Sequence, residues 1–237
     1  MAMNMKSAGK NMSELENQND QLRVLVCDDH PIIREAIAGV LESSDHMQVV
    51  GVISSFDEGV QFVQDISIDV AVLDVHLKGR SGLELAEYIR IAQPGIKVVM
   101  LTAFVSDELI FEAKKIGVSA IIDKNLDTDR IADRVLAASI GKTCVDDIVL
   151  TDVVSRLKDD GIISLLNLSK VDRQIVALVA EGHSDKEIGA LVFLSSQTVR
   201  NRISRILTLL GKSNRTQIAL LLNKLDEVVQ QRFLSQV

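Results

Sequence analysis

The chain has 237 residues, of which 47% are hydrophobic and 25% are charged, and its formal net charge is −7 at pH 7. This composition excludes collagen-like, disulfide-stapled and intrinsically disordered chains. No apolar run approaches the roughly 18 residues that a membrane span needs, and no secretory signal is recognisable, so we expect a cytoplasmic protein without a membrane partner. Its two cysteines, Cys27 and Cys144, are expected to be reduced thiols.

The charge is divided unevenly along the chain. Residues 22–142 hold 12 Lys and Arg against 19 Asp and Glu, a net −7, whereas residues 164–237 hold 10 against 6, a net +4. Such an asymmetry indicates two modules with different partners. The acidic total therefore does not exclude a nucleic-acid partner for the basic module.

The first part of the chain alternates between two kinds of pattern. Residues 1–21 hold four of the six methionines and almost no other large apolar side chain, which predicts a disordered tail. Over residues 22–142, short runs that are apolar at odd and even positions alternate with segments of helical periodicity. This predicts an α/β domain with a doubly wound, five-stranded parallel sheet, whose ligands bind at the carboxyl ends of the strands.

Polar residues follow four of these apolar runs, at the predicted ligand edge. The five runs are residues 24–27, 49–53, 70–73, 98–101 and 120–122. Asp28 and Asp29 follow the first run, Asp74 the third, Thr102 the fourth and Lys124 the fifth. Three converging carboxylates repel one another unless a cation lies between them, and their oxygens suit Mg²⁺. The pattern predicts a phosphoryl-transfer site, in which one carboxylate attacks phosphorus, a lysine neutralises charge and a hydroxyl donates a hydrogen bond.

These residues, in this order, resemble the receiver domain of two-component response regulators. The resemblance implies a flavodoxin-like fold over residues 22–142, phosphorylation by a sensor histidine kinase, and Mg²⁺ as cofactor. The implied site residues are the phosphoacceptor Asp74, the metal ligands Asp28, Asp29, Asp74 and His76 (through its backbone carbonyl), and the phosphoryl-contact and switch residues Thr102, Lys124 and Ile121.

Two positions depart from the receiver pattern. Lys78 stands where the family usually has proline, and Ile121 stands where an aromatic switch residue is usual. No ligand is lost, so chemistry at Asp74 is expected to survive, but an aromatic rotamer switch cannot operate unchanged. A regulator that works without phosphorylation, with a vestigial receiver, stays open as an alternative.

An enzyme is the second alternative. Phosphatases of the haloacid-dehalogenase type resemble this site, because they also use an aspartate as the covalent nucleophile. They need a second aspartate two residues after the nucleophile, and that position is His76 here. We therefore expect a regulator and not an enzyme.

The second part of the chain carries helical signals only. Residues 143–165 are predicted to form a linker with one short helix, followed by a helical domain over residues 166–237. A capping box at residues 184–187 opens a short helix, and Ser195 can cap a longer one that continues to Leu210. Two helices joined by a tight turn, the second rich in arginine, are typical of a helix-turn-helix.

The faces of the longer helix follow from its periodicity. The predicted inward side chains are Val199, Ile203, Ile206, Leu207 and Leu210. The predicted base-reading side chains, on the opposite face, are Gln197, Arg200, Asn201 and Ser204. The predicted DNA phosphate contacts are Lys186, Ser196, Thr198, Arg202 and Arg205.

Residues 166–231 closely resemble the DNA-binding domain of LuxR/NarL-type regulators. The resemblance is carried by the segments 181–188, 194–201 and 210–217. Val171 and Asp172 replace the usual Arg-Glu pair, and Arg202 stands where His or Tyr is common.

A predicted fourth helix, over residues 214–229, carries an apolar stripe. Leu222, Leu225 and Val229 are expected to stay partly uncovered, and the resemblance implies that this helix pairs two chains into a homodimer. Such a dimer would read an operator of double-stranded DNA built from inverted or direct repeats, with RNA polymerase as a further partner to consider. Residues 71–75, 106–108 and 200–205 look most similar to the DosR or DevR regulators. The resemblances together imply a response regulator whose phosphorylation controls dimerisation and transcription.

Overall fold

The computed structural model describes residues 21–125, 128–142 and 147–235. The predicted tail, apart from its last residue, and Cys144 lie outside these ranges. The described residues form two compact units, and each is considered by itself. One contains residues 21–103 and 117–142, and the other contains residues 104–116 and 147–235.

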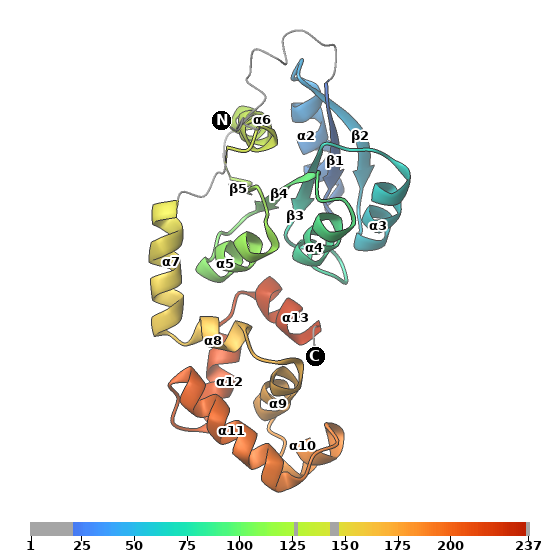
Figure 1. Ribbon diagram of the computed structural model, residues 1–237. Helices are drawn as coiled ribbons and strands as arrows, with labels where there is room; N and C mark the ends of the chain where they lie inside the picture. Colours follow the sequence, from blue (N-terminus) through green and yellow to red (C-terminus); the bar gives the residue numbers. More distant parts are fainter. Residues whose placement is uncertain (1–20, 126–127, 143–146, 236–237) are drawn as a thin grey trace, which may run out of the picture. The chain divides into compact units, whose positions relative to one another are not determined.

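The first unit is a parallel sheet with helices packed against it (Figure 1). Its strands are β1 (Leu22–Cys27), β2 (Met47–Ile53), β3 (Val70–Asp74), β4 (Lys97–Thr102) and β5 (Ala120–Asp123). They lie in the order β2-β1-β3-β4-β5, and all neighbouring pairs are parallel. Its helices are α2 (Pro31–Glu42), α3 (Phe56–Asp65), α4 (Gly82–Ala92) and α6 (Thr128–Ser139). The predicted doubly wound, flavodoxin-like sheet is confirmed.

Local sequence explains why these elements begin and pack where they do. The central strands β3 and β4 are apolar on both faces, and almost every residue in them is buried. Helix α3 begins after Ser55, whose side chain accepts a hydrogen bond from the backbone of Glu58. Helix α4 begins with a capping box between Ser81 and Glu84. These caps set the points at which the chain leaves the sheet, and so position the loops at its carboxyl edge.

The second unit is helical. Its elements are α5 (Asp107–Ile116), α7 (Asp147–Asp159), α8 (Ile162–Leu166), α9 (Lys170–Ala180), α10 (Asp185–Leu191), α11 (Ser196–Leu210), α12 (Arg215–Asn223) and α13 (Glu227–Ser235). Helix α5 lies between β4 and β5 in the sequence, yet it packs against α7 and α13 in this unit. The predicted single helix over residues 214–229 is wrong, because residues 224–226 separate α12 from α13.

The predicted signals of the helix-turn-helix are confirmed. Ser184 and Glu187 form the capping box that opens α10, and the Ser195 side chain accepts a hydrogen bond from the backbone N–H of Thr198 at the start of α11. Helix α11 ends at Leu210, and the next residue, Gly211, adopts a left-handed conformation with φ of 63°. The recognition-helix candidate therefore has firm boundaries at both ends.

Gly82 offers a test of how tightly this fold packs around the acidic cluster, which consists of Asp28, Asp29 and Asp74. A Cβ atom at Gly82 would overlap the backbone oxygen of Asp74, so Gly82→Ala should lower the free energy of unfolding by about 1–3 kcal/mol. The matched control is Gly39→Ala on α2, where a Cβ meets nothing within 4 Å. That control should gain about 0.5–1 kcal/mol, because alanine favours the helix. Urea unfolding would measure both, and equal effects would contradict the proposed crowding at Asp74.

Candidate functional site

The acidic cluster lies where the order of the strands reverses. Strands β1 and β3 are neighbours, with Cys27 paired to Leu73, so the residues that follow them share the carboxyl edge of the sheet. Asp28 directly follows β1 and Asp74 is the last residue of β3; their exposed fractions are 0% and 3%. The topology alone therefore brings two buried carboxylates together.

Lys124 joins this cluster from the end of β5. Its Nζ atom lies 2.7 Å from Asp28 Oδ2 and 2.9 Å from Asp74 Oδ2. Its backbone N–H donates a 2.7 Å hydrogen bond to the backbone oxygen of Thr102, which ends β4. One ammonium group thus bridges two buried carboxylates, in a setting where such attractions are much stronger than in water.

The cluster nevertheless holds more negative than positive charge. Burial raises the pKa of Asp74 above its usual value, and the hydrogen bond and charge of Lys124 offset only part of this effect. The nearby Asp28 carboxylate raises the pKa further, while the backbone N–H of His76 lowers it. A second cation would therefore relieve repulsion that Lys124 leaves.

The donor set fits a magnesium ion. Asp28, Asp29, His30 and Asp74 each offer a ligand atom, and these atoms lie within 4.8 Å of one another. Asp29 Oδ1 is buried and accepts no hydrogen bond within the described residues, although His30 Nδ1 is 2.7 Å away. The His30 side chain is 68% exposed, and Mg²⁺ prefers oxygen to imidazole ligands. Three carboxylates, one of them with an unsatisfied oxygen, are the appropriate ligands.

The remaining receiver residues of the prediction lie around this cluster in different environments. Thr102 is fully buried at the end of β4, and Ile121 is 7% exposed within β5. His76 and Lys78 are exposed in the segment that follows Asp74. Metal binding by the His76 carbonyl and the switching roles of Thr102 and Ile121 stay predictions.

Cys27, next to the cluster, is a buried thiol. It is 1% exposed, and burial, followed by the charges of Glu58, Asp28 and Asp74, raises its pKa to about 12. A protonated thiol at neutral pH is unreactive. Cys27 therefore offers no thiolate at this edge of the sheet.

Helix α11 presents the two faces that its periodicity predicts. Val199, Ile203, Ile206 and Leu210 are buried, and Leu207 is half-buried. All four predicted base-reading side chains are exposed: Gln197, Arg200, Asn201 and Ser204. Gln197 Nε2 donates a 3.0 Å hydrogen bond to Asn201 Oδ1, and Arg200 Nε lies 3.2 Å from Asp185 Oδ2. The polar face is therefore preordered, while contact with bases stays a prediction.

The side chains predicted to contact DNA phosphates differ in exposure, and two of them share a partner within the chain. Lys186, Ser196 and Arg205 are exposed, and Thr198 and Arg202 are half-buried. Asp172 on α9 is 4% exposed and binds two of them, with Arg202 Nη1 at 2.8 Å and Arg205 Nη2 at 2.8 Å. Asp172 and Arg202 are two of the residues that depart from the LuxR/NarL pattern, and they contact each other. Sequence alone could not pair them, because 30 residues separate them.

Both halves of the chain match known families. Residues 24–136 match the model of the response regulator receiver domain, and residues 166–222 match the bacterial regulatory proteins of the luxR family. The transcriptional regulatory protein LiaR of Bacillus subtilis (strain 168) is 34% identical over 200 residues, which cover 84% of this chain and 95% of LiaR. The chain belongs to the LuxR/NarL-type response regulators.

Further relatives support this assignment. The DNA-binding transcriptional activator DevR/DosR of Mycobacterium tuberculosis is 30% identical over 209 residues, covering 86% of this response regulator and 95% of DevR/DosR. The fold is similar to that of RcsB from Salmonella enterica serovar Typhimurium bound to a promoter, with a TM-score of 0.57, 22% identity, and coverage of 86% and 98%. Within its described part, this response regulator has no helix long and apolar enough to cross a membrane.

The predicted dimer residues of this response regulator are covered. Leu222, Leu225 and Val229 are 2%, 5% and 1% exposed, so the expectation that they stay partly uncovered is wrong for this structure. The cause is the break after α12, which lets α12 pack on α9 while α13 packs on α5 and α9. The exposed apolar side chain on α12 is instead Leu220, at 58%. Any role of α12 in dimerisation stays a proposal.

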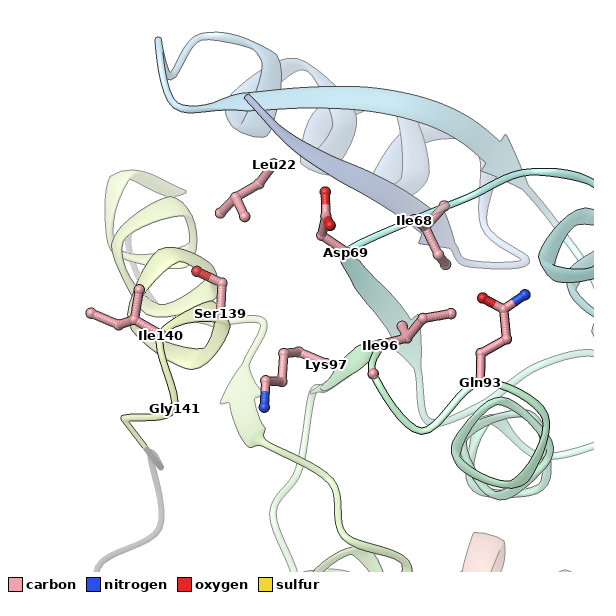
Figure 2. Close-up of a pocket in the computed structure, with 10 residues that line it drawn as sticks. Leu22, Ile68, Asp69, Gln93, Ile96, Lys97, Ser139, Ile140 and Gly141 are labelled. Atoms are coloured by element: carbon pink, nitrogen blue, oxygen red, sulfur yellow. The ribbon is translucent and has the colours of Figure 1, made fainter. Parts of the chain in front are cut away.

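A hollow of about 550 Å³ opens at the opposite edge of the sheet (Figure 2). It is lined by Leu22 and Lys97, the first residues of β1 and β4, and by Asp69, which precedes β3. The Asp69 carboxylate accepts a 2.8 Å hydrogen bond from the backbone N–H of Arg23. None of the predicted receiver site residues of this response regulator lines this hollow.

Lys124→Met tests the charge balance of the cluster. It should lower the free energy of unfolding by about 3 kcal/mol, because two buried carboxylates lose their shared ammonium group. Adding Mg²⁺ should then stabilise Lys124→Met more than the wild type. Thermal melts with and without Mg²⁺ would measure this, with Lys124→Met/Asp29→Asn as the matched variant that should respond less. Equal Mg²⁺ responses in the wild type and Lys124→Met would contradict this account of the cluster.

Asp172 makes a prediction about pH. Burial opposes its ionisation, but hydrogen bonds from Ser169 and Arg202, together with the charges of Arg202 and Arg205, lower its pKa below the usual 3.8. Since Arg205 is 65% exposed, Asp172→Asn should cost about 1–2 kcal/mol of unfolding free energy at pH 7. A lowered pKa stabilises the fold above pH 3.8, and this contribution disappears as the carboxylate protonates. Urea unfolding should therefore give a constant difference from pH 7 to pH 5, and a difference that decays in that interval would refute an ionised Asp172.

Proposed function

We propose that a sensor histidine kinase phosphorylates Asp74, and that the phosphoryl group controls dimerisation and binding to operator DNA, so that this regulator adjusts transcription. The observation that carries the proposal is the cluster itself. A buried carboxylate lies 2.9 Å from an ammonium group, beside two further carboxylates whose ligand atoms lie within 4.8 Å of it. This arrangement suits a nucleophile that needs both a cation and a charge-neutralising lysine.

The chain and the donor histidine supply every group that the proposed phosphoryl transfer to Asp74 needs. An Asp74 oxygen forms a bond to phosphorus while the bond from phosphorus to the donor histidine nitrogen breaks, and the electron pair leaves with that imidazole nitrogen. The Lys124 ammonium is placed to stay with the transferred group, since it already contacts Asp74. The hydroxyl of Thr102 is the proposed donor to a phosphoryl oxygen.

Magnesium would be held by Asp28, Asp29, Asp74 and the backbone carbonyl of His76. When bound, it would supply positive charge that offsets the phosphoryl oxygens. Asp29 Oδ1 is buried and accepts no hydrogen bond among the described residues, although His30 Nδ1 lies 2.7 Å away, and this supports the assignment. The chain's own contribution is to hold the carboxylates together and to keep Lys124 between Asp28 and Asp74.

Helix α5 offers a route from this cluster to the DNA-binding helices. In the sequence it lies between Thr102 and Lys124, the two residues proposed to contact the phosphoryl group. Its Glu112 is buried and lies 3.3 Å from Arg232 of α13, and its Asp107 lies 2.6 Å from Arg156 of α7. A shift of the segments that carry Thr102 and Lys124 would act on these two ion pairs.

The relatives support the DNA-binding half of the proposal. RcsB forms dimers bound to DNA in one of the similar structures, which shares 22% identity and a TM-score of 0.55 with this chain. In this chain, the exposed polar face of α11 supplies amide and guanidinium groups suited to base edges. We infer that Gln197, Arg200, Asn201 and Ser204 read bases, and that a homodimer reads a repeated operator.

Two alternative functions are weighed against this proposal: a regulator that ignores phosphate and a phosphatase. Lys78 and Ile121, which depart from the receiver pattern, favour a regulator that ignores phosphate. A phosphatase would need an acid two residues after Asp74, and His76 there is exposed and carries no carboxylate. The intact carboxylates and Lys124 favour the switch over both.

The central test compares the wild type with Asp74→Asn. Both are incubated with acetyl phosphate and Mg²⁺, and intact mass and affinity for an operator duplex are measured. The wild type should gain one phosphoryl group and bind DNA about tenfold more tightly, which corresponds to about 1.4 kcal/mol. Asp74→Asn should gain neither, because an amide is a poor nucleophile.

Asp65→Asn is the matched control, since Asp65 is an exposed acid at the end of α3. It should behave as the wild type in both measurements. Equal DNA affinity with and without the phosphoryl group would refute the switch in favour of the vestigial receiver. Continuous release of inorganic phosphate at enzymatic rates would favour the phosphatase.

A further inference from the structure

We propose that Phe193, in the turn between α10 and α11, makes an apolar contact with double-stranded DNA, to a thymine methyl group or a deoxyribose. Phe193 is the one residue other than glycine with a positive φ, 57°, within the described part of the chain. For a bulky side chain this left-handed conformation is unfavourable, and glycine would adopt it without cost.

The turn itself imposes this conformation. The backbone N–H of Leu194 donates a 2.9 Å hydrogen bond to the oxygen of Gly189, so the chain reverses within three residues after α10. A Cβ atom at Gly189 would lie 2.5 Å from the Leu194 oxygen, which shows how closely the two segments approach. The backbone at residue 193 therefore has little freedom to relax, and a phenylalanine there is strained.

Within the described part of the chain, packing of the Phe193 side chain does not offset that strain. The Phe193 side chain is 94% exposed, more than any other large hydrophobic residue of the described chain. Aromatic rings are usually buried, and bulky residues usually avoid a left-handed backbone. Positions that depart from both preferences are common at binding sites. The stabilisation of Phe193 is therefore expected to come from a partner.

The surroundings of the ring point to DNA as that partner. Phe193 precedes Ser195, the N-cap of α11, by two residues, and the exposed Gln197 and Arg200 follow in the first turns of that helix. The amino end of such a helix is the part that enters the major groove, so the preceding turn comes close to the duplex. A phenylalanine ring can pack on a thymine methyl group, or on the sugar at the groove wall.

The test uses the full-length wild type, Phe193→Gly and Phe193→Asn, since glycine and asparagine both accept the left-handed conformation. Thermal melting should show no loss of stability in either variant. Affinity is measured on a duplex selected from random sequence by the wild type, with and without phosphorylation, so a failed phosphorylation switch would not hide the contact. The Kd should rise about fivefold to tenfold in both variants.

Leu209→Ala is the matched control, since Leu209 is 55% exposed on the same helix but at its other end, and it should bind as the wild type. The slope of log Kd against log salt should not change in the Phe193 variants, because no phosphate contact is removed. A reduced slope would overturn the proposal by indicating a displaced α11.

Two further outcomes separate the possible contacts. Replacing thymine by uracil removes the methyl group: weaker wild-type binding to the uracil duplex would identify the thymine methyl, and unchanged binding would identify the sugar.

Phe193 variants with wild-type Kd would overturn the proposal. If they also lost transcription in a reporter assay, a protein partner would be the occupant of this surface.

Discussion

The first unit, which contains the receiver sheet, depends on placing two carboxylates, Asp28 and Asp74, side by side at a buried edge of that sheet. The order of the strands forces this placement, because β1 and β3 are neighbours and both end at the same edge. Two such charges are tolerated only with a cation between them, and Lys124 provides one from β5. Most of the site follows from that constraint: the position of Lys124, its backbone bond to Thr102, and the excess of negative charge that favours a metal ion.

The same constraint recurs in the helical unit. Glu112 and Arg232 are each 5% exposed and pair with one another, and the buried Asp172 is shared by Arg202 and Arg205. In both cases the pair joins elements that are distant in sequence. Buried charges of this kind define which helices can pack together, because a wrong partner would leave a charge unpaired at a cost of several kcal/mol, about 3–5 by typical measurements. Their value here is therefore specificity of arrangement as much as stability.

Sequence predicted the features that depend on local pattern. The strand ends, the capping box at Ser184 and the buried face of α11 follow from residue type and spacing, and the structure confirms them. The packing of Leu222, Leu225 and Val229 could not be predicted, because their coverage depends on a helix break and on nonlocal packing. The pairing of Glu112 with Arg232 spans 120 residues and leaves no periodic signal. The left-handed backbone of Phe193 could not be predicted for another reason, since residue type does not reveal it.

The ion pair between Glu112 and Arg232 also limits how a switch through α5 can work. Separating two buried charges is costly, so α13 would leave α5 only if both groups gained water or new partners at the same time. Reversing a 99:1 preference between two arrangements takes about 5.5 kcal/mol of differential stabilisation. On the proposed phosphorylation of Asp74, a phosphoryl group would add a charge of about −1.5 to −2 beside Lys124, which would then divide its contacts among more oxygens. In the proposed switch, this redistribution would strain β5 and, through residues 117–119, which join the two elements, α5. The resting ion pairs of α5 would then set the threshold that phosphorylation has to overcome.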